Sequence, residues 1–334
     1  MTVCWRNGDG MNERDSKNYL VFGLSEAGKS TFAAALWHLV DSREVPTVLA
    51  KGLHSGNFAY LEKIAQRWSD GWRLERTKSE EVEDVRINLR HEESGAEFSL
   101  EFRDIAGESL QTAFATRYCD PDFVELVKKA DGMLLFVSAN YEMDDVTILD
   151  VKAKLGDDDD EELDEDDDDG EGDEDENGTQ AAVGDAKTVP ERQQPLKAED
   201  PPFEPAKAPV QVRLVDLLQS LRLDPFSRRP FRIAVIVSAW DLAKHRSAEE
   251  WLAKCMPLLD QFLRGGEIAD AVRMYGVSAQ GGMYPKKGER DDEERKRIMA
   301  IRPASKRIRV VGHGAAEHDL THPVRWLSGL ESND

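Results

Sequence analysis

Apolar residues occur along this chain in short uninterrupted runs and in runs with helical spacing. Uninterrupted apolar runs are typical of buried strands, and they occupy 18–23, 132–139, 231–240 and 271–279. Apolar and polar residues alternate in two further segments, 82–90 and 96–104, as in paired strands, and EESG between them is typical of a hairpin turn. Helical spacing predicts helices over 30–42, 57–72, 120–130 and 247–265.

The order of these elements predicts the fold class. A strand and a helix are followed by a hairpin, and strands and helices then alternate to the end of the series. This order predicts an α/β protein whose mostly parallel sheet is covered by helices on both faces and carries one antiparallel hairpin strand. Two of the apolar runs, 132–139 and 231–240, are consecutive strands in this order only if the chain between them is treated as an insertion.

That intervening chain has an extreme charge. Residues 157–176 hold 17 acidic and no basic residues, and removing them from the net charge of −22 leaves −5 for the rest. Such a segment repels itself and lacks apolar residues, and loop-like composition continues through the prolines of 190–210. We expect a disordered insertion over 156–209, so that 1–155 and 210–334 form a single domain. A polyacidic loop can attract divalent cations or basic partners, but a solvated linker is the simpler interpretation.

Composition excludes several other classes. An apolar fraction of 40% in 334 residues is enough for a core, and no run approaches the roughly 18 apolar residues that span a bilayer. The first 16 residues lack the apolar centre of a secretory signal. Cys4, Cys119 and Cys255 are scattered, which supports neither a disulfide framework nor a thiolate metal site. We therefore expect a cytoplasmic protein without a membrane span.

The stretch VFGLSEAGKSTF, residues 21–32, carries the first chemistry. Gly23, Gly28, Lys29 and Ser30 satisfy the phosphate-loop spacing Gly-x-x-x-x-Gly-Lys-Ser/Thr, between a predicted strand and a predicted helix. Such a loop aims backbone N–H groups and a helix N-terminus at an anion. Lys29 is then expected to reach the terminal phosphates and Ser30 to bind Mg²⁺. A structural turn before a capped helix would leave the lysine unexplained.

Further polar residues follow the other predicted strands. DIAGE places Asp104, Gly107 and Glu108 after the second hairpin strand, where Asp104 could hold Mg²⁺ through water and the Gly107 N–H could meet a γ-phosphate. SAWD (238–241) and SAQG (278–281) follow two later strands. Ligands bind at the carboxyl ends of strands in open α/β sheets, so these segments are expected to meet.

This series resembles the motifs of regulatory GTPases over residues 18 to about 281 outside the insertion. Within that class the chain is similar to the bacterial double-GTPase family associated with conflict systems, on the basis of GLSEAGKST, WSDGWRLERT, DIAGE, SAWD and HDLTHPVRWL. The resemblance implies a P-loop fold that binds GTP or GDP with Mg²⁺. It implies guanine recognition by Asp241, Ser278 and the Ala279 N–H, and a switch threonine at Thr77, with Thr47 as runner-up. The phosphate-loop residues implied to contact nucleotide are Gly23, Ser25, Glu26, Ala27, Gly28, Lys29, Ser30 and Thr31, the metal ligands are Ser30, Thr77 and Asp104, and the catalytic set is Lys29, Thr77, Gly107 and Glu108.

Two departures from the GTPase pattern change the expectations. Ser238 and Ala239 replace the usual Asn/Thr and Lys of the base-reading motif, which puts guanine selectivity in question. Trp240 could stack on a base, although a tryptophan beside buried strands is more often part of a core. Glu108 occupies the place of a water-positioning Gln, and a carboxylate there is disfavoured beside a triphosphate.

No arginine falls in the phosphate loop to act in cis. The arginines near the predicted switch segments are interpreted as surface or salt-bridged residues, and they are Arg73, Arg76, Arg103 and Arg117. We therefore expect slow hydrolysis that a partner accelerates.

The C-terminal region offers two weaker candidates. Residues 286–309 hold ten basic and five acidic residues, but mixed charge without aromatics favours a solvated surface over a nucleic-acid patch. His313, His318 and His322 could suggest a metal, yet Pro323 argues against one continuous helix there. Capping by Asp319 or Thr321 of a final helix that begins at Pro323 explains the pattern better, with Trp326 and Leu327 packing that helix onto the sheet.

The sequence thus predicts a GTP-hydrolysing switch that acts on partner proteins. Alternatives are a nucleotide-binding scaffold that does not hydrolyse, favoured by Glu108 and the altered base motif, and an ATP-using P-loop protein. A protein effector or activator is expected, and nucleic acid is not.

Overall fold

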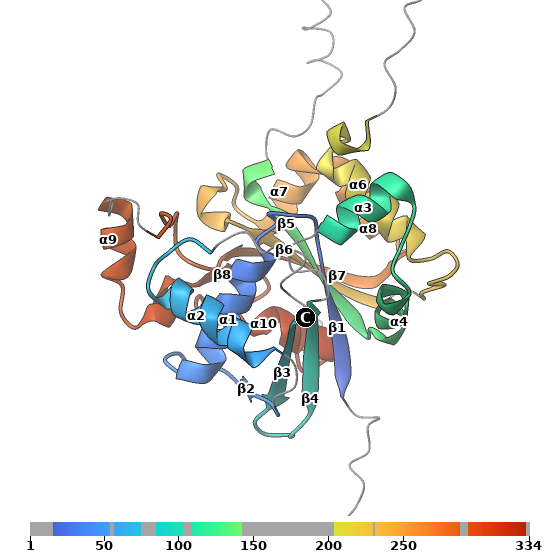
Figure 1. The fold of residues 1–334 in the computed structure, drawn as a ribbon. Helices are drawn as coiled ribbons and strands as arrows, with labels where there is room; N and C mark the ends of the chain where they lie inside the picture. The colour runs from blue at the N-terminus through green and yellow to red at the C-terminus, as the bar shows by residue number, and fades with distance from the viewer. Residues whose placement is uncertain are drawn as a thin grey trace, which may run out of the picture. The chain divides into compact units, whose positions relative to one another are not determined.

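A computed structural model describes residues 16–53, 57–74, 85–102, 108–141, 204–229, 231–287 and 293–331. The elements in these ranges belong to one unit, formed by Met1–Asp145 and Pro205–Asp334. Its centre is an eight-stranded sheet with the order β2-β3-β4-β1-β5-β6-β7-β8 (Figure 1). The strands are β1 (Lys17–Phe22), β2 (Leu49–Lys51), β3 (Val85–His91), β4 (Glu97–Phe102), β5 (Gly132–Ser138), β6 (Phe231–Ser238), β7 (Ala269–Ser278) and β8 (Arg309–Val311).

The sheet is mostly parallel, as the sequence predicts. β1 lies between β4 and β5, and the parallel pairing continues through β6 to β7. β3 forms the predicted antiparallel hairpin with β4. The sheet is longer than predicted at both edges, because β2 pairs antiparallel with β3 and β8 pairs antiparallel with β7.

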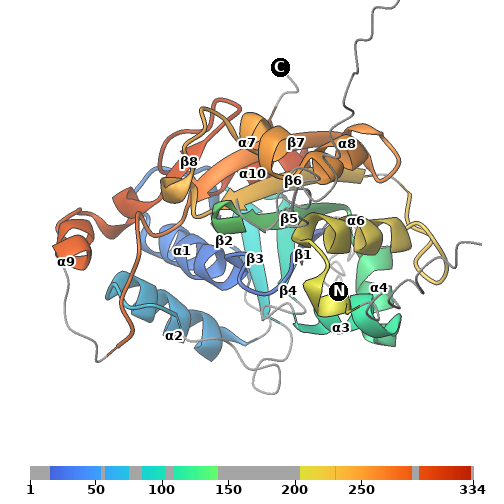
Figure 2. The ribbon, with the colours of Figure 1, turned by 90° about the horizontal axis from the view of Figure 1, so that it is seen from above.

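Helices cover both faces of the sheet, and alternate residues of each strand contact one layer or the other (Figure 2). In β1, Tyr19 and Val21 pack with α1, α2 and α10, whereas Leu20 and Phe22 pack with α3, α4, α6, α7 and α8. The helices are α1 (Lys29–Ser42), α2 (Phe58–Ser69), α3 (Glu108–Thr116), α4 (Pro121–Lys129), α6 (Val210–Ser220), α7 (Ala248–Cys255), α8 (Pro257–Arg264), α9 (Glu293–Met299) and α10 (His322–Ser328). These two buried layers confirm the predicted architecture.

Several boundaries differ from the sequence prediction for local reasons. The helix predicted over 247–265 is two helices, because Pro257 cannot donate the N–H that would continue α7 and instead begins α8. Residues 205–209, assigned from sequence to the insertion, belong to the folded unit: Pro205–Lys207 forms a 3-10 helix and Ala208 is buried in the core. The rest of the predicted insertion, 156–203, lies outside the described residues.

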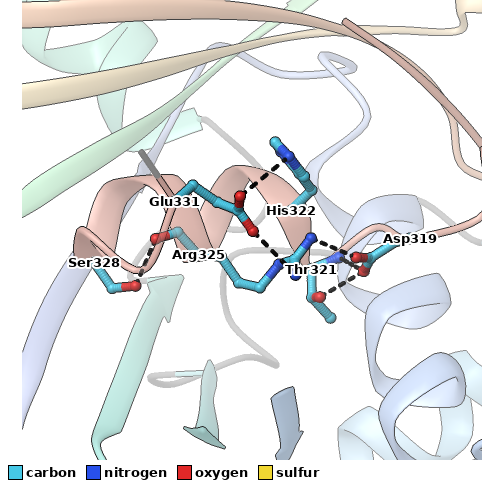
Figure 3. Close-up of polar contacts among 6 residues, drawn as sticks. All are labelled: Asp319, Thr321, His322, Arg325, Ser328 and Glu331. Atoms are coloured by element: carbon cyan, nitrogen blue, oxygen red, sulfur yellow. Dashed lines mark hydrogen bonds and ion pairs between the residues drawn. The ribbon is translucent and has the colours of Figure 1, made fainter. Parts of the chain in front are cut away.

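The C-terminal helix is held by a polar network (Figure 3). Asp319 accepts hydrogen bonds from the Thr321 N–H and hydroxyl, at 3.0 and 2.5 Å, just before α10 begins. Arg325 Nη2 donates to the other Asp319 oxygen at 2.9 Å, and its Nη1 pairs with Glu331 at 3.0 Å. Asp319 therefore holds the turn that leads into this helix. The helix begins at His322 rather than Pro323, and its N-cap Thr321 makes no side-chain capping hydrogen bond, so the predicted capping differs in detail.

The same region packs as expected, and it shows no cation site. Trp326 and Leu327 are buried against the sheet. Within the described part of the chain, no group of three His, Cys, Asp or Glu side chains is arranged to hold a metal ion. His313 instead pairs with Glu249, at 3.0 Å, and holds the pKa of that carboxyl down to about 2.

No helix in the described ranges is both long enough and apolar enough to cross a lipid bilayer.

Candidate nucleotide site

A cavity of about 280 Å³ opens at the carboxyl ends of the central parallel strands. Most of its walls come from the ends of β1, β5, β6 and β7 and the segments that follow them, and these are four consecutive strands of the sheet. Among the lining residues are Glu26, Gly28, Thr31, Asp241 and Ala279. The structure therefore brings the phosphate-loop segment, SAWD and SAQG to one cavity, the arrangement expected of a ligand site in an open α/β sheet.

The phosphate-loop segment between β1 and α1 is held against the sheet by its glycines. Gly28 has φ of 90°, and a Cβ at this position would lie 2.7 Å from Ser238 Oγ and 2.8 Å from Ser238 Cβ. A Cβ on Gly23 would lie 2.8 Å from the Phe136 carbonyl oxygen. Only glycine permits these approaches without displacing the neighbouring strand, so the spacing of the two glycines has a steric reason.

Lys29 is buried and folds back over the loop. Its Nζ donates to the carbonyl oxygens of Gly23, at 2.6 Å, and Leu24, at 2.9 Å. The Lys29 ammonium group, which has three N–H donors, is thus held against the loop carbonyls at the N-terminus of α1. Lys29, which a simple structural turn would not require, therefore bridges the two carbonyl groups at the start of the phosphate-loop segment.

The N-terminus of α1 has no side-chain cap, a feature that it shares with α6, α8 and α10 but not with α2, α4 and α7. Asn57, Asp120 and Ser247 each accept a backbone N–H at the start of α2, α4 and α7. The N-cap of α1 is Gly28, which has no side chain to accept, and its first turn contains no acidic residue. The first N–H groups of a helix have no intrahelical partner, so this end of a 14-residue helix suits an anion.

Ser238 ties the end of β6 to the phosphate loop. Its hydroxyl donates to the Ala27 carbonyl at 2.8 Å, across a sequence separation of 211 residues. Ala239 follows in the left-handed conformation, with φ of 51°, and turns the chain into the short helix Trp240–Leu242. The serine that departs from the usual motif therefore makes a specific contact with the loop.

Trp240 packs beneath the sheet end and does not line the cavity. A Cβ on Gly276 would lie 2.4 Å from the Trp240 ring, so the indole rests on the backbone of β7. Its remaining contacts are with the core layer that contains α7 and α8. The structure favours the core interpretation of this tryptophan over base stacking.

Asp241 faces the cavity, and Ser278 orients its carboxylate. The Ser278 hydroxyl donates to Asp241 Oδ1 at 2.5 Å and accepts the Gly281 N–H at 3.2 Å. Ser278 is 1% exposed, so its hydroxyl position is fixed by packing. The pair links the two segments that the sequence assigned to base recognition.

The loop after β7 is held by one side chain from α2 and by one from its own segment. Trp68 of α2 donates its indole N–H to the Ala279 carbonyl at 2.9 Å. Tyr284 donates its hydroxyl to the Gln280 carbonyl at 3.0 Å, and burial raises the pKa of this phenol so that it stays protonated. Neither residue was predicted from sequence, since nothing in a local pattern pairs position 68 with position 279.

The remaining predicted residues have different outcomes. The Ser25 carbonyl accepts the Tyr141 hydroxyl at 2.8 Å, which fixes the loop against the segment after β5. Ser30 is the second residue of α1, and Glu108 is the first residue of α3. The side chain of Glu108 and the residues Arg76, Thr77, Arg103, Asp104 and Gly107 lie outside the description. Thr47, the runner-up for the switch residue, donates to the Leu49 carbonyl at 2.8 Å.

A parallel sheet with this loop at the end of its first strand defines the class of the protein as a P-loop nucleotide-binding fold. Comparison with protein families makes the assignment specific: the Double-GTPase 1 family matches residues 20–327, and the chain belongs to it. A search among curated proteins gives no match.

Proposed function

We propose that this protein is a GTP-binding switch that hydrolyses GTP slowly with Mg²⁺ and regulates partner proteins. The observation that carries the proposal is the meeting of the Gly23–Ser30 loop with the Asp241–Ser278 pair at one cavity. The first suits phosphates and the second suits a base with two adjacent N–H donors. Membership in the double-GTPase family supports the same ligand.

The phosphate end of the cavity fits a polyphosphate. The N–H groups at the start of α1 and the buried Lys29 ammonium place positive charge there. Ser30 would hold Mg²⁺, together with Asp104 and Thr77 from the segments outside the described ranges. Mg²⁺, when bound, neutralises charge on the terminal phosphates.

The base end selects by hydrogen-bond donors. Ser278 holds Asp241 in one orientation through Oδ1, so the carboxylate is presented without having to reorganise. A carboxylate is an acceptor only, and it pairs with guanine N1–H and N2–H₂ but finds no matching donor pair on adenine. The same carboxylate therefore discriminates against ATP.

Hydrolysis is proposed to be slow in isolation. Glu108 is the first residue of α3 and occupies the place of a water-positioning Gln, and a carboxylate beside the phosphates would oppose catalysis. Arg117, one of the arginines near this segment, is paired with Asp216 of α6. An activating partner would supply the missing positive charge. A role in a bacterial conflict or defence system is part of this proposal and is supported by the family resemblance alone.

Competition binding tests the proposal. Fluorescent GTP with Mg²⁺ is displaced by unlabelled GTP, GDP or ATP from the wild type and from Asp241→Asn. We expect GTP and GDP to compete and ATP to fail, with weaker binding in the variant. Equal competition by ATP, unaffected by Asp241→Asn, would reduce the assignment to a nucleotide-binding module without guanine selectivity. Single-turnover hydrolysis then separates a switch from a non-hydrolysing scaffold, and a rate near 1 per second without a partner would contradict slow hydrolysis.

A further inference from the structure

The chain that leaves α2 turns sharply toward the base end of the cavity. Gly71 has φ of 70°, and a Cβ there would lie 2.4 Å from the Met299 sulfur of α9. Trp72 is covered by the Arg295 guanidinium, 4.0 Å from its ring centroid, and Arg295 also donates to the Gly71 carbonyl at 3.0 Å. These contacts fix the direction in which the next residue, Arg73, leaves the turn.

The backbone of Arg73 is anchored beside the base-reading loop. Its N–H donates to the Pro285 carbonyl at 2.8 Å, and its own carbonyl accepts Arg67 Nε at 2.7 Å. Met283 and Tyr284, just before Pro285, line the same cavity as Arg73. The anchor therefore places Arg73 at the end of the cavity formed by the loop after β7, whereas the phosphate loop follows β1 on the other side of β5 and β6.

Arg73 brings positive charge to a wall that otherwise carries carboxylates. The other charged residues that line the cavity are Glu26 and Asp241. Arg73 is exposed, and no ion pair of its side chain is found among the described residues. Arg73 thus lines the cavity without a partner carboxylate in the described part of the chain.

We propose that Arg73 is a base-binding residue whose guanidinium lies against the purine base. This inference rests on the proposed function. A planar guanidinium stacks well on aromatic faces. In related motifs a lysine at the position of Ala239 packs along the base, and alanine offers only a methyl group there. Arg73, which follows α2, supplies the packing on the base that the SAWD motif lacks.

Affinity measurements for guanosine, GDP and GTP test the inference and locate the contact. Dissociation constants for the three ligands are measured for wild type, Arg73→Ala and Arg73→Lys, with Arg297→Ala on the nearby α9 as a matched surface control. A contact with the base predicts that Arg73→Ala weakens all three ligands by the same factor, about tenfold. The planar stack predicts that Arg73→Lys recovers only part of this loss. The control is expected to bind like the wild type.

Two results would overturn the inference. Unchanged affinity in Arg73→Ala would show that the side chain does not touch the ligand, and a loss at least threefold larger for GDP or GTP than for guanosine would place it on the phosphates. The outcome is separable from the proposed function: if wild type binds guanine nucleotides and Asp241→Asn weakens them while Arg73→Ala does not, only the inference fails. A wild type that binds no nucleotide would remove both.

Discussion

Replacement of Gly28 by alanine tests the steric basis of the phosphate loop. Gly28 is the N-cap of α1 and has φ of 90°, a conformation that L-residues rarely adopt. The new Cβ would lie 2.7 Å from Ser238 Oγ and 2.8 Å from Ser238 Cβ. Since Ser238 also donates to the Ala27 carbonyl, it cannot move away without losing that hydrogen bond.

The expected cost follows from these two contributions. Alanine at positive φ costs about 1–2 kcal/mol. Displacing Ser238 costs about 1 kcal/mol for the hydrogen bond to Ala27. Together they predict a decrease of about 2–3 kcal/mol in the free energy of unfolding.

Gly95 provides a matched control for this substitution. It lies in the turn between β3 and β4 with φ of 71°, and a Cβ there has no neighbour within 4 Å. Gly95→Ala therefore carries the backbone cost alone, about 1–2 kcal/mol. Urea unfolding, followed by tryptophan fluorescence, measures both variants.

A double-mutant cycle isolates the clash with Ser238. Gly28→Ala is measured in the wild type and in a Ser238→Gly background, where both contacted atoms are removed. We expect a smaller cost in the second background. Equal costs for Gly28→Ala in the two backgrounds, or equal costs for Gly28→Ala and Gly95→Ala, would refute the steric argument.

Two further predictions concern buried polar side chains. Ser278→Ala removes the hydrogen bond to Asp241, and we expect about tenfold weaker GTP binding. Ser305→Ala, at a buried serine that does not line the cavity, should bind normally. Burial lowers the pKa of His322, which is faced by Arg325, Glu331, Asp319 and Arg273. The unfolded state then binds the proton more tightly than the folded state, so the free energy of unfolding should decrease as the pH drops through 6.5. In His322→Gln, the urea midpoint should change less between pH 7.5 and pH 5.5 than it does in the wild type. An unchanged pH slope in this variant, or an unchanged GTP affinity in Ser278→Ala, would contradict the respective argument.

The centre of the fold was predictable because its strands are fully buried. Every residue of β5 is buried, so uninterrupted apolar sequence marks it clearly. The edges were not predictable, since β2 and β8 are three residues each and their pairing depends on strands that lie far away in sequence. Helix α9 was missed for a related reason, because Ile298 is its one buried residue and the contacts of Arg295 and Met299 with Gly71 join distant parts of the sequence.

The candidate site divides in the same way. Local patterns predicted Gly28, Lys29 and Asp241, because each belongs to a motif with fixed spacing. The contact of Ser238 with Ala27 and that of Trp68 with Ala279 each join residues 211 positions apart, and no local pattern encodes them. Sequence reasoning therefore predicted candidate site residues, but not the long-range contacts that hold the loops of the site in place.

The two departures in the base-reading motif have separable physical consequences. Ser238 retains a hydrogen-bonding group and ties β6 to the phosphate loop, so the mechanical link between the two ends of the cavity is preserved. Ala239 has only a methyl group in place of the lysine side chain, and the neighbouring Trp240 packs on the backbone of β7. Any compensating contact must come from another wall of the cavity. Arg73 lines such a wall, on a turn that four side-chain or backbone contacts to Met299, Arg295, Pro285 and Arg67 hold in place. Base recognition in this protein would then depend on the turn that follows α2 as well as on the segments that follow β6 and β7.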